Sequence, residues 1–407
     1  MTVDFQDRRF YGRVAVFRHD MYRLLFTATL GSGLGTWMAT IALTLDVKAR
    51  TDSTWWVAAL FIVTFLPTVV IGLAVGPLVD RMSRKGLIVA ADLVRLVVFV
   101  VLPFVDSALV LVVFAAVAGI ANSFFRPAVL AGVPNLVDES ELASASSLLQ
   151  ATDWLATAAG PVIGGAIVSV SGPHLVYWIN AATFLFSAAL LVRIPGRYLQ
   201  SEQGITRGHW RDVREGIAAF RSRALRTVLI GFGLTMLGTG LVNVSEIFLA
   251  TRSLHSNAFG YGLLWTATGV GLVVGSVLVG YVLEHRQVLD VYPFVFIPWA
   301  AGTLGAGVSP NVWIAALAMI LSGLGNGLTF PMTVVIVQRY VSDRLRGRAF
   351  TVIISVHNGL LLCAMVAAGA LTAAWGARWS YVLAAVLFTL GGAAAYGLGR
   401  GAEPPPA

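Results

Sequence analysis

Four charged residues of particular interest stand inside long apolar runs of this sequence, where a charge is costly to keep. They are Asp92, Arg95, Asp153 and Glu246. Charged side chains within apolar spans commonly mark proton, ion or substrate pathways. Glu246 lies near the end of its run, one helical turn after Asn243, so its carboxylate could take up a proton, attract a cationic substrate, or exchange one for the other. The alternative is a glutamate at the membrane surface, in contact with water.

The other charged positions admit more than one role. Asp153 could relay protons, pair with Arg126, or cap a helix. Asp92 and Arg95 are one helical turn apart, which favours a gating or structural pair. His357 also lies in an apolar run, where a single histidine is more often a packing residue than a titrating one.

The residue types that enzymes need do not come together in the sequence. We find no phosphate-binding loop, no cluster with metal-ligand spacing and no nucleophile triad. Cys363 is the only cysteine, which excludes an internal disulfide and a cysteine metal site. We therefore expect no enzyme activity, no catalytic residues, no metal, no cofactor and no ATP-driven pumping by this chain.

The composition indicates what positions these residues. Of the 407 residues, 57% are hydrophobic and 12% are charged, against about 25% charged in soluble domains. Apolar runs long enough to cross a bilayer recur along the chain, and helices are the expected spans because lipid cannot satisfy backbone groups. We predict an all-α integral membrane protein with twelve spans: 23–46, 54–78, 87–105, 108–128, 144–170, 174–193, 226–250, 258–283, 288–307, 312–337, 349–374 and 377–399.

The basic residues predict the orientation of these spans. If the chain starts in the cytoplasm and alternates, all but four of its 28 Lys and Arg residues fall on the inside. This bias predicts cytoplasmic N- and C-termini, with the net charge of +8 serving orientation rather than nucleic-acid binding. Several tryptophans fall at the predicted outer ends, as in an interfacial belt: Trp55, Trp56, Trp178, Trp313, Trp375 and Trp379.

One long polar stretch divides the chain. Residues 196–225 combine apolar residues at helical spacing with arginines between them, which predicts an amphipathic linker on the cytoplasmic surface. We therefore predict a six-helix bundle over 1–195 and a second over 226–407. The segment 125–137 loosely resembles 330–341, which favours related halves with binding at their interface.

A loop motif joins the second and third spans. Residues 76–85 read Gly-Pro-Leu-Val-Asp-Arg-Met-Ser-Arg-Lys, and this pattern resembles the loop signature of the major facilitator superfamily. Ser83 departs from it, since the signature usually has glycine there. The resemblance implies a loop that latches the two halves in the outward-facing state. The predicted gating set is Gly76, Asp80, Arg81, Arg84, Asp92 and Arg95.

A second motif lies in the fifth span, where residues 160–165 read Gly-Pro-Val-Ile-Gly-Gly. It resembles the Gly-Pro motif of drug antiporters in the same superfamily. The positions that carry it are Gly160, Pro161, Gly164 and Gly165. Tight helix packing is the alternative explanation, because glycines let helix backbones approach.

Residues 338–350, together with 125–128 and 134–142, are similar to the branch that holds macrolide-efflux-type and enterobactin-exporter-type proteins. The resemblance covers essentially the whole chain and implies export. It also implies that the first, fourth, seventh and tenth helices line a cavity. The predicted substrate or proton positions are Glu246, Asp153, Asn243, Trp37, Asn326 and Phe330. The fourth helix lacks the mid-span arginine of many proton-coupled exporters, so coupling rests on Glu246 and Asp153.

We therefore predict a secondary-active exporter of amphipathic small molecules, of the multidrug or macrolide type, working by proton antiport and alternating access. The alternatives are a dedicated exporter of an endogenous metabolite such as a siderophore, a lysolipid transporter, or a membrane sensor that transports nothing. A latch-like loop argues against the sensor. The expected setting is the bacterial cytoplasmic (inner) membrane. The expected partners are a small amphipathic substrate, protons and the lipid bilayer; we expect no nucleic-acid partner and a monomer.

Overall fold

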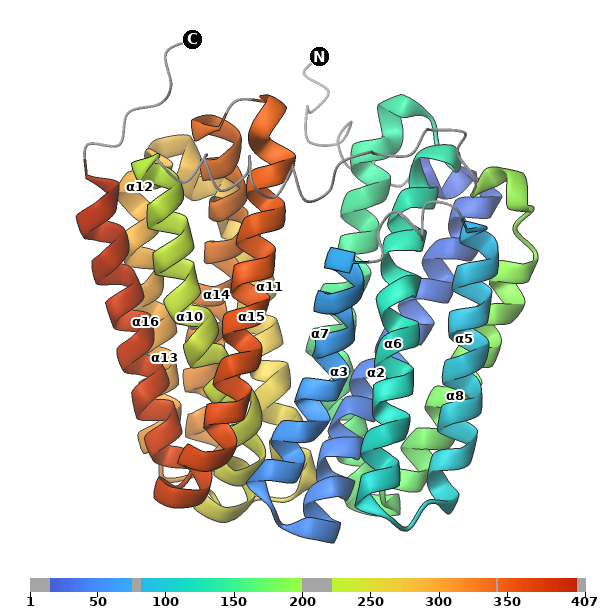
Figure 1. Cartoon of the computed structure of the whole chain (residues 1–407), viewed down its shortest axis with the longest axis horizontal. Helices are drawn as coiled ribbons and strands as arrows, with labels where there is room; N and C mark the ends of the chain where they lie inside the picture. Colours follow the sequence, from blue (N-terminus) through green and yellow to red (C-terminus); the bar gives the residue numbers. More distant parts are fainter. Residues whose placement is uncertain (1–14, 75–81, 200–221, 342, 401–407) are drawn as a thin grey trace, which may run out of the picture. The chain divides into compact units, whose positions relative to one another are not determined.

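A computed structural model describes residues 15–74, 82–199, 222–341 and 343–400. Within these ranges all regular structure is helical (Figure 1). Twelve helices in the described part are long and apolar enough to cross a membrane, which confirms the predicted fold class. The spans begin and end within a few residues of the predicted ones for most helices. The main helices are α2 (Asp20–Thr51), α3 (Thr54–Ala74), α5 (Arg84–Val101), α6 (Ala108–Gly132), α7 (Leu142–Ser171), α8 (Pro173–Val192), α10 (Arg223–Phe248), α11 (Ala258–His285), α12 (Val288–Val291), α13 (Phe296–Val308), α14 (Val312–Tyr340), α15 (Asp343–Trp375) and α16 (Ala377–Gly399).

Short turns extend or join these helices. The ninth span combines α12, one turn and α13 over Val288–Val308. A π-helical turn, η6, continues α10. The short elements are η1 (Ala15–Arg18), η2 (Leu102–Phe104), η3 (Val133–Asn135), η4 (Glu139–Glu141), η5 (Gly196–Tyr198), η6 (Leu249–Ser253) and η7 (Tyr292–Val295).

Local sequence signals explain where several helices begin. The side chain of Ser83 accepts a hydrogen bond from the Gly86 amide and caps α5. Serine thus has a structural use at the position where it departs from the loop signature. Asn257 and Asn311 cap α11 and α14 in the same way. Gly172 and Gly376, with φ of 76° and 84°, reverse the chain between α7 and α8 and between α15 and α16.

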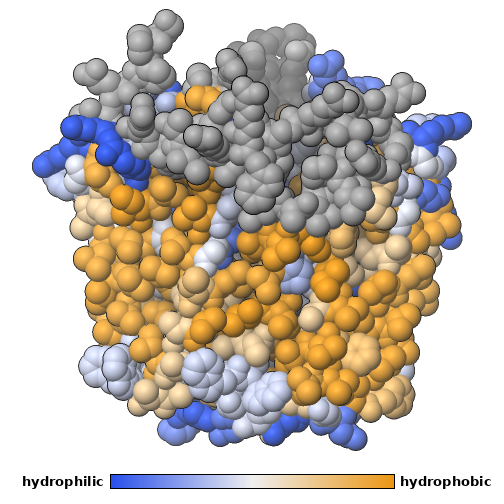
Figure 2. Space-filling model, in the orientation of Figure 1, coloured by the Kyte–Doolittle hydropathy of each residue, from blue (hydrophilic) through white to orange (hydrophobic). Residues whose placement is uncertain are grey.

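The surface agrees with a membrane protein. Hydrophobic residues cover the middle of the helices in Figure 2, and hydrophilic residues gather toward their ends. Five of the six predicted interfacial tryptophans are 42–64% exposed: Trp55, Trp178, Trp313, Trp375 and Trp379. Amphipathic aromatic rings at span ends suit the level of the lipid headgroups.

Contacts within the chain divide it into two units. The first comprises Met1–Leu43 and Val63–Ile205, and the second comprises Thr44–Ile62 and Thr206–Ala407. The end of α2 and the start of α3 therefore group with the second unit; we call this part, residues 44–62, the hairpin segment. Most of the predicted linker, 200–221, lies outside the described residues, and the division at 195 and 226 stays a prediction.

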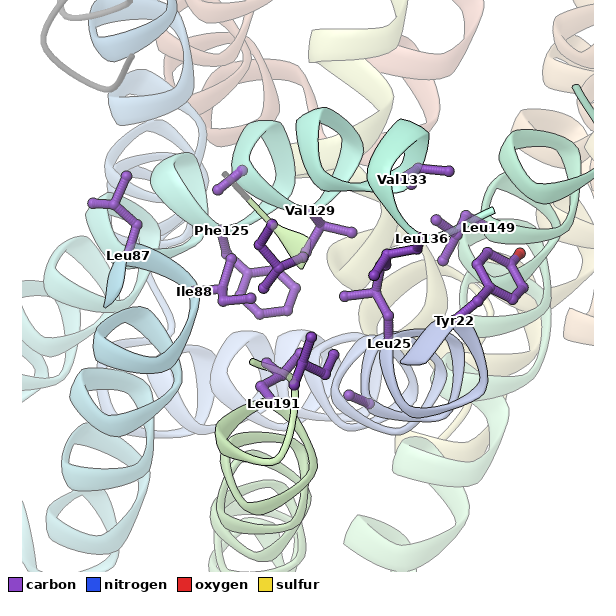
Figure 3. Close-up of a cluster of buried hydrophobic side chains, with 14 of the residues drawn as sticks. Tyr22, Leu25, Leu87, Ile88, Phe125, Val129, Val133, Leu136, Leu149 and Leu191 are labelled. Carbon is purple, nitrogen blue, oxygen red and sulfur yellow. The ribbon is translucent and has the colours of Figure 1, made fainter. Parts of the chain in front are cut away.

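The first unit has a core near the C-terminal end of α6. It combines side chains from α2, α5, α6, α7 and α8, and Figure 3 shows them pointing toward one another. Lipid tails are as apolar as these side chains, so close packing holds the cluster together more than exclusion from lipid. The labelled members are Tyr22, Leu25, Leu87, Ile88, Phe125, Val129, Val133, Leu136, Leu149 and Leu191.

In the second unit, α10 packs against α15 and α16, while α11 packs against α14. The α11–α14 crossing is lined by glycines on both helices. A Cβ atom on Gly271 would stand 2.0 Å from the Ile320 carbonyl oxygen, and one on Gly327 would stand 2.1 Å from that of Leu272. Only glycine allows such backbone approach.

Candidate functional site

Glu246 lies in α10 and is 3% exposed. Its Oε1 atom is buried and has no hydrogen-bond partner in the described structure. The position is therefore not that of a water-exposed surface glutamate in this conformation. A buried carboxyl group with an unsatisfied oxygen is unusual, because an unmet polar group costs about 1–3 kcal/mol.

Two tyrosines face the region of Glu246. Tyr261 from α11 and Tyr381 from α16 are each 0% exposed, and Glu246 lies close enough to both for their charges to interact. Their hydroxyl oxygens are also buried without a hydrogen-bond partner. Thr44, from the hairpin segment, and Trp265 are the polar neighbours of Tyr261.

The hairpin segment is attached to the rest of the second unit by several contacts. Arg252 forms an ion pair with Asp52 (2.8 Å) and donates a second hydrogen bond to its carbonyl oxygen (2.9 Å). The Thr54 hydroxyl donates to the Gly369 carbonyl oxygen (2.6 Å), and the Phe61 ring stacks on Trp265 with centroids 6.3 Å apart. Arg252 holds the pKa of Asp52 below its usual value, mainly through the hydrogen bond to the carboxylate.

Asp92 and Arg95 form a buried ion pair within α5. Their side chains are 0% and 4% exposed, and Arg95 Nη2 lies 2.5 Å from Asp92 Oδ1. The Arg95 guanidinium stands 4.4 Å from the ring centroids of both Phe125 (α6) and Phe184 (α8). Arg95 also donates to the Asn122 side chain (3.3 Å). The pair thus joins three helices of the first unit. The expected charge network around Asp80 is outside the described residues.

Asp153 pairs with Arg126, one of the alternatives that the sequence offered. The ion pair joins α7 to α6 at 2.5 Å, and the two side chains are 28% and 48% exposed. Arg126 also donates to Gln150 (3.3 Å). An arginine already balances this carboxylate, so Asp153 differs from Glu246 in its electrostatic setting.

The Gly-Pro motif of α7 packs directly on α2. A Cβ atom on Gly160 would stand 2.6 Å from the Trp37 Cβ atom, and one on Gly164 would stand 2.7 Å from the Met38 carbonyl oxygen. Pro161 and Gly165 are buried in the same helix. Trp37, predicted to line a cavity, is half-buried and lies at this crossing.

The remaining predicted positions are spread over two helices of the second unit. Asn243 is half-buried, one turn before Glu246 in α10. Asn326 and Phe330 are one turn apart in α14; Asn326 is half-buried and Phe330 is 51% exposed. His357 is 4% exposed and its ring meets Phe232 edge-on, with centroids 4.5 Å apart, as expected of a packing residue.

The gating-loop positions Gly76, Asp80 and Arg81 lie outside the described residues. The basic residues that follow bind helix ends within the first unit. Arg84 donates to the Ala131 carbonyl oxygen (2.9 Å), and Lys85 donates to that of Val192 (2.7 Å). Cations are favoured at helix C-termini because the last carbonyl groups carry partial negative charge.

The motif at 338–350 makes a similar contact in the second unit. Arg346 of α15 donates to the carbonyl oxygens of Gln338 and Val341 at the end of α14. In the first unit, the segment after α6 forms an ionic cluster instead. Arg18 pairs with Asp138 (2.7 Å) and Glu141 (3.3 Å), and His19 lies 2.7 Å from Glu141. The ligand atoms of His19, Asp138 and Glu141 lie within 4.8 Å of one another, and Arg18 forms an ion pair with each of the two acids.

Sequence reasoning missed Tyr261, Tyr381 and Thr44 as neighbours of Glu246. Hydroxyl-bearing residues are common in membrane helices, so none stood out singly in the sequence. Their positions on α11, α16 and the hairpin segment converge only after packing. A carboxyl group and two hydroxyl groups held in this buried region are suited to proton binding and exchange.

The comparisons with known proteins agree with this architecture. A family model described as transmembrane secretion effector matches residues 11–399. The uncharacterized MFS-type transporter YfiS of Bacillus subtilis (strain 168) is 24% identical over 395 residues, or 92% of each chain. The enterobactin exporter EntS of Citrobacter koseri is 25% identical over 342 residues, covering 81% of this chain and 80% of that one. Macrolide efflux protein A of Streptococcus pyogenes is 22% identical over 343 residues, covering 80% and 84%.

Solved structures show the same fold. A bacterial homologue of the iron transporter ferroportin, in an inward-facing state, matches 94% of this chain and 99% of its own with a TM-score of 0.73 and 13% identity. A bacterial homologue of the human lysosomal transporter Spinster matches 93% and 97% with a TM-score of 0.71 and 14% identity. With twelve membrane helices and a family match over nearly its full length, the chain belongs to the transmembrane secretion effector family of the major facilitator superfamily, a family of membrane transporters with exporters among its members.

Proposed function

We propose that this protein exports amphipathic small molecules by proton antiport, with Glu246 as the proton-carrying residue. The observation that carries the proposal is the burial of Glu246 without a hydrogen-bond partner on Oε1 or an ion pair among the described residues. A buried carboxylate with no counter-ion is strongly disfavoured, and proton binding removes its charge. Such a group can exchange a proton as its surroundings alternate between buried and water-accessible.

The expected cycle couples this exchange to the hairpin segment. Closing the hairpin segment over the end of α10 buries Glu246, and opening it exposes the carboxyl group to water. A proton from outside then enters on Glu246 and leaves toward the cytoplasm, while the substrate moves the other way. Asp153 is a weaker candidate for this role, because Arg126 already neutralises it.

The substrate class is supported by the relatives. Macrolide efflux protein A and the enterobactin exporter EntS are both named for bulky compounds. A ligand of that size buries most of its surface in a cavity lined mainly by hydrophobic and aromatic side chains. We propose Trp37, Asn243, Asn326 and Phe330 as cavity positions. The gating loop with Gly76, Asp80, Arg81 and Arg84, the antiporter role of Gly160, and an active monomer in the inner membrane are parts of the same proposal.

The test is efflux of a cationic dye from cells and the corresponding uptake of the dye into everted membrane vesicles. We expect Glu246→Gln to abolish proton-driven efflux, because an amide cannot exchange a proton, and Asp80→Asn to reduce it. A protonophore should stop efflux by the wild type. The matched control is Glu284→Gln, which neutralises an exposed glutamate at the end of α11. Wild-type efflux that persists in Glu246→Gln and in the presence of protonophore excludes proton antiport.

A second candidate is export of one endogenous product, such as a siderophore. The similarity to the enterobactin exporter EntS favours it. Deletion of the gene should then cause a single metabolite to accumulate inside the cell, and the purified protein should transport that compound but no panel of unrelated dyes. Efflux of several unrelated dyes contradicts this candidate.

A further inference from the structure

Three buried polar atoms lack hydrogen-bond partners in one region of the second unit. They are Glu246 Oε1 and the hydroxyl oxygens of Tyr261 and Tyr381. Buried hydroxyl groups nearly always find a partner, and each that does not costs about 1–3 kcal/mol. The Glu246 oxygen and the Tyr381 hydroxyl group therefore remain without a partner, and the Tyr261 hydroxyl group has only Thr44 and Trp265 as polar neighbours besides Glu246.

The three groups come from three different helices. Glu246 is on α10, Tyr261 on α11 and Tyr381 on α16, and α16 packs along α10. All three side chains are 0–3% exposed. An amphipathic substrate needs a cavity of about 300 Å³ or more, and these three buried atoms are closed even to water in this conformation, so no such substrate contacts them here.

The charged residues of the hairpin segment, η6 and the start of α16 form ion pairs or hydrogen bonds with groups other than Glu246. On the hairpin segment, Asp46 is ion-paired with Arg50 (2.6 Å). Arg378, one turn before Tyr381, donates to the carbonyl oxygens of Gly307 (2.7 Å) and Ser253 (3.3 Å). Arg252 on η6 holds Asp52. Among the described residues, no basic side chain forms an ion pair with Glu246.

Titratable groups also lie on the other helices packed on α10. On α15, His357 contacts Phe232, which is 14 residues from Glu246 and so about 21 Å away along α10. Cys363 of α15 is exposed. The remaining titratable or charged residues of α11 and α14 in the described ranges stand at the opposite ends of those helices: Tyr281, Glu284, His285, Arg339 and Tyr340.

We propose that Tyr261 and Tyr381 are positioning residues for the proton that Glu246 carries. Their hydroxyl groups donate hydrogen bonds to the Glu246 carboxylate after it releases its proton, and they separate from it when the proton is bound. No covalent bond changes: the proton leaves the carboxyl group for water, and two O–H donors then meet the negative oxygens. The inference rests on the proposed role of Glu246.

Two donors are suited to this task because no basic side chain among the described residues forms an ion pair with Glu246. Hydrogen bonds to a charged group are about twice as strong as neutral ones, so two hydroxyl groups can compensate much of the burial of a carboxylate. When Glu246 is protonated, the two tyrosine hydroxyl groups lose the negatively charged acceptor that would bind them most strongly. The absence of hydrogen bonds from these hydroxyl groups to Glu246 Oε1 in this conformation is therefore consistent with a protonated Glu246. Thr44, beside Tyr261, connects the group to the hairpin segment.

The experiment measures dye transport by the purified protein in proteoliposomes as a function of pH. Tyr261→Phe and Tyr381→Phe should each move the pH of half-maximal transport upward by about one unit. The reason is that each variant loses a charge-assisted hydrogen bond of about 1.5 kcal/mol to the Glu246 carboxylate, so the carboxyl group releases its proton at higher pH. The matched control is Tyr292→Phe, since Tyr292 is also fully buried in the second unit but its hydroxyl group bonds Thr333 (2.9 Å). That variant should keep the wild-type pH profile.

An infrared titration of the protonated carboxyl band gives a second readout that does not need transport. The band should vanish in Glu246→Gln and should titrate at higher pH in both phenylalanine variants, provided that they stay folded by size-exclusion chromatography. If the pH profile responds to Glu246→Gln but not to either phenylalanine variant, or if those variants only lower the rate, the tyrosines do not position the proton. If Glu246→Gln itself leaves the profile and the band unchanged, the proposed function fails instead.

Discussion

One guanidinium group of the first unit is held between two aromatic rings. Arg95 bonds Asp92 and stands 4.4 Å from the ring centroids of Phe125 and Phe184. Cation–π contacts gain strength when they are desolvated, and the ion pair balances the charge. The group therefore fixes α5 against α6 and α8.

We expect Arg95→Met to lower the free energy of unfolding by about 3 kcal/mol, because it leaves the Asp92 carboxylate buried without a partner. The double variant Asp92→Leu with Arg95→Met should recover much of this loss. Thermal unfolding in detergent measures both. A double variant as unstable as the single one would show that the rings, and not the ion pair, hold Arg95 in place.

At the residue scale, the sequence identified the charged residues that are costly to bury in a membrane, but it did not identify their partners. Glu246, Asp153 and the Asp92–Arg95 pair were all visible as charges within apolar runs. Pairing of Asp153 with Arg126 was one of several possibilities, because helix-to-helix distances do not follow from spacing along one helix. The tyrosines around Glu246 gave no signal, since tyrosine is compatible with lipid-facing and buried positions alike.

At the scale of elements, glycine sets the distance between helices. Gly271 and Gly280 stand on the same helix, α11, yet a Cβ atom on Gly271 would meet the Ile320 backbone whereas one on Gly280 would meet nothing within 4 Å.

We expect Gly271→Ala to destabilise the protein by about 2 kcal/mol, because the α11–α14 crossing must widen. Gly280→Ala should be neutral or stabilising by up to about 1 kcal/mol, since alanine favours the helix. Thermal unfolding of the two variants side by side checks this. Equal melting temperatures would mean that the crossing can widen without cost.

The hairpin segment is the other element with a testable contact. Arg252 lowers the pKa of Asp52 from its ordinary value of 3.8, so the ion pair stabilises the closed hairpin at neutral pH and this contribution is lost as the pH falls through the lowered pKa. The side chain of Asp52 is 64% exposed, so the effect should be small.

We expect a spin label at Ser53, in a Cys363→Ser background, to become more mobile only at pH values below about 4 in the wild type. In Arg252→Gln the spin label should be more mobile at every pH, and the mobile fraction of the label should rise by no more than a few-fold. Arg286→Gln, at the C-terminal end of α11 and thus at the opposite end of that helix from Arg252, is the control and should behave as the wild type. Equal label mobility in Arg252→Gln and wild type at neutral pH would show that Arg252 does not hold the hairpin.

At the scale of the whole molecule, the prediction concerns the orientation of the chain in the membrane. The basic residues predict cytoplasmic termini. A fluorescent protein fused after Arg400 should therefore fluoresce, and alkaline phosphatase inserted at His255 should be active outside. The inverse pattern, with an inactive phosphatase at His255, would reverse the proposed direction of proton entry.

The sequence by itself determined the number, type and approximate limits of the spans. This follows because lipid imposes one strong rule: every span must satisfy its own backbone groups over about 20 apolar residues. The motifs at 76–85 and 338–350 also determined the superfamily, which the comparisons confirm.

Only the tertiary structure decided which residues meet. It grouped the hairpin segment with the second unit, placed Tyr261 and Tyr381 beside Glu246, and left Asp153 paired with Arg126. The lipid-facing and core-facing sides of a membrane helix differ little in hydrophobicity, because lipid and protein core are equally apolar. Their rotation and pairing are therefore set by shape, by glycine contacts and by a few polar groups, none of which can be located before the helices pack.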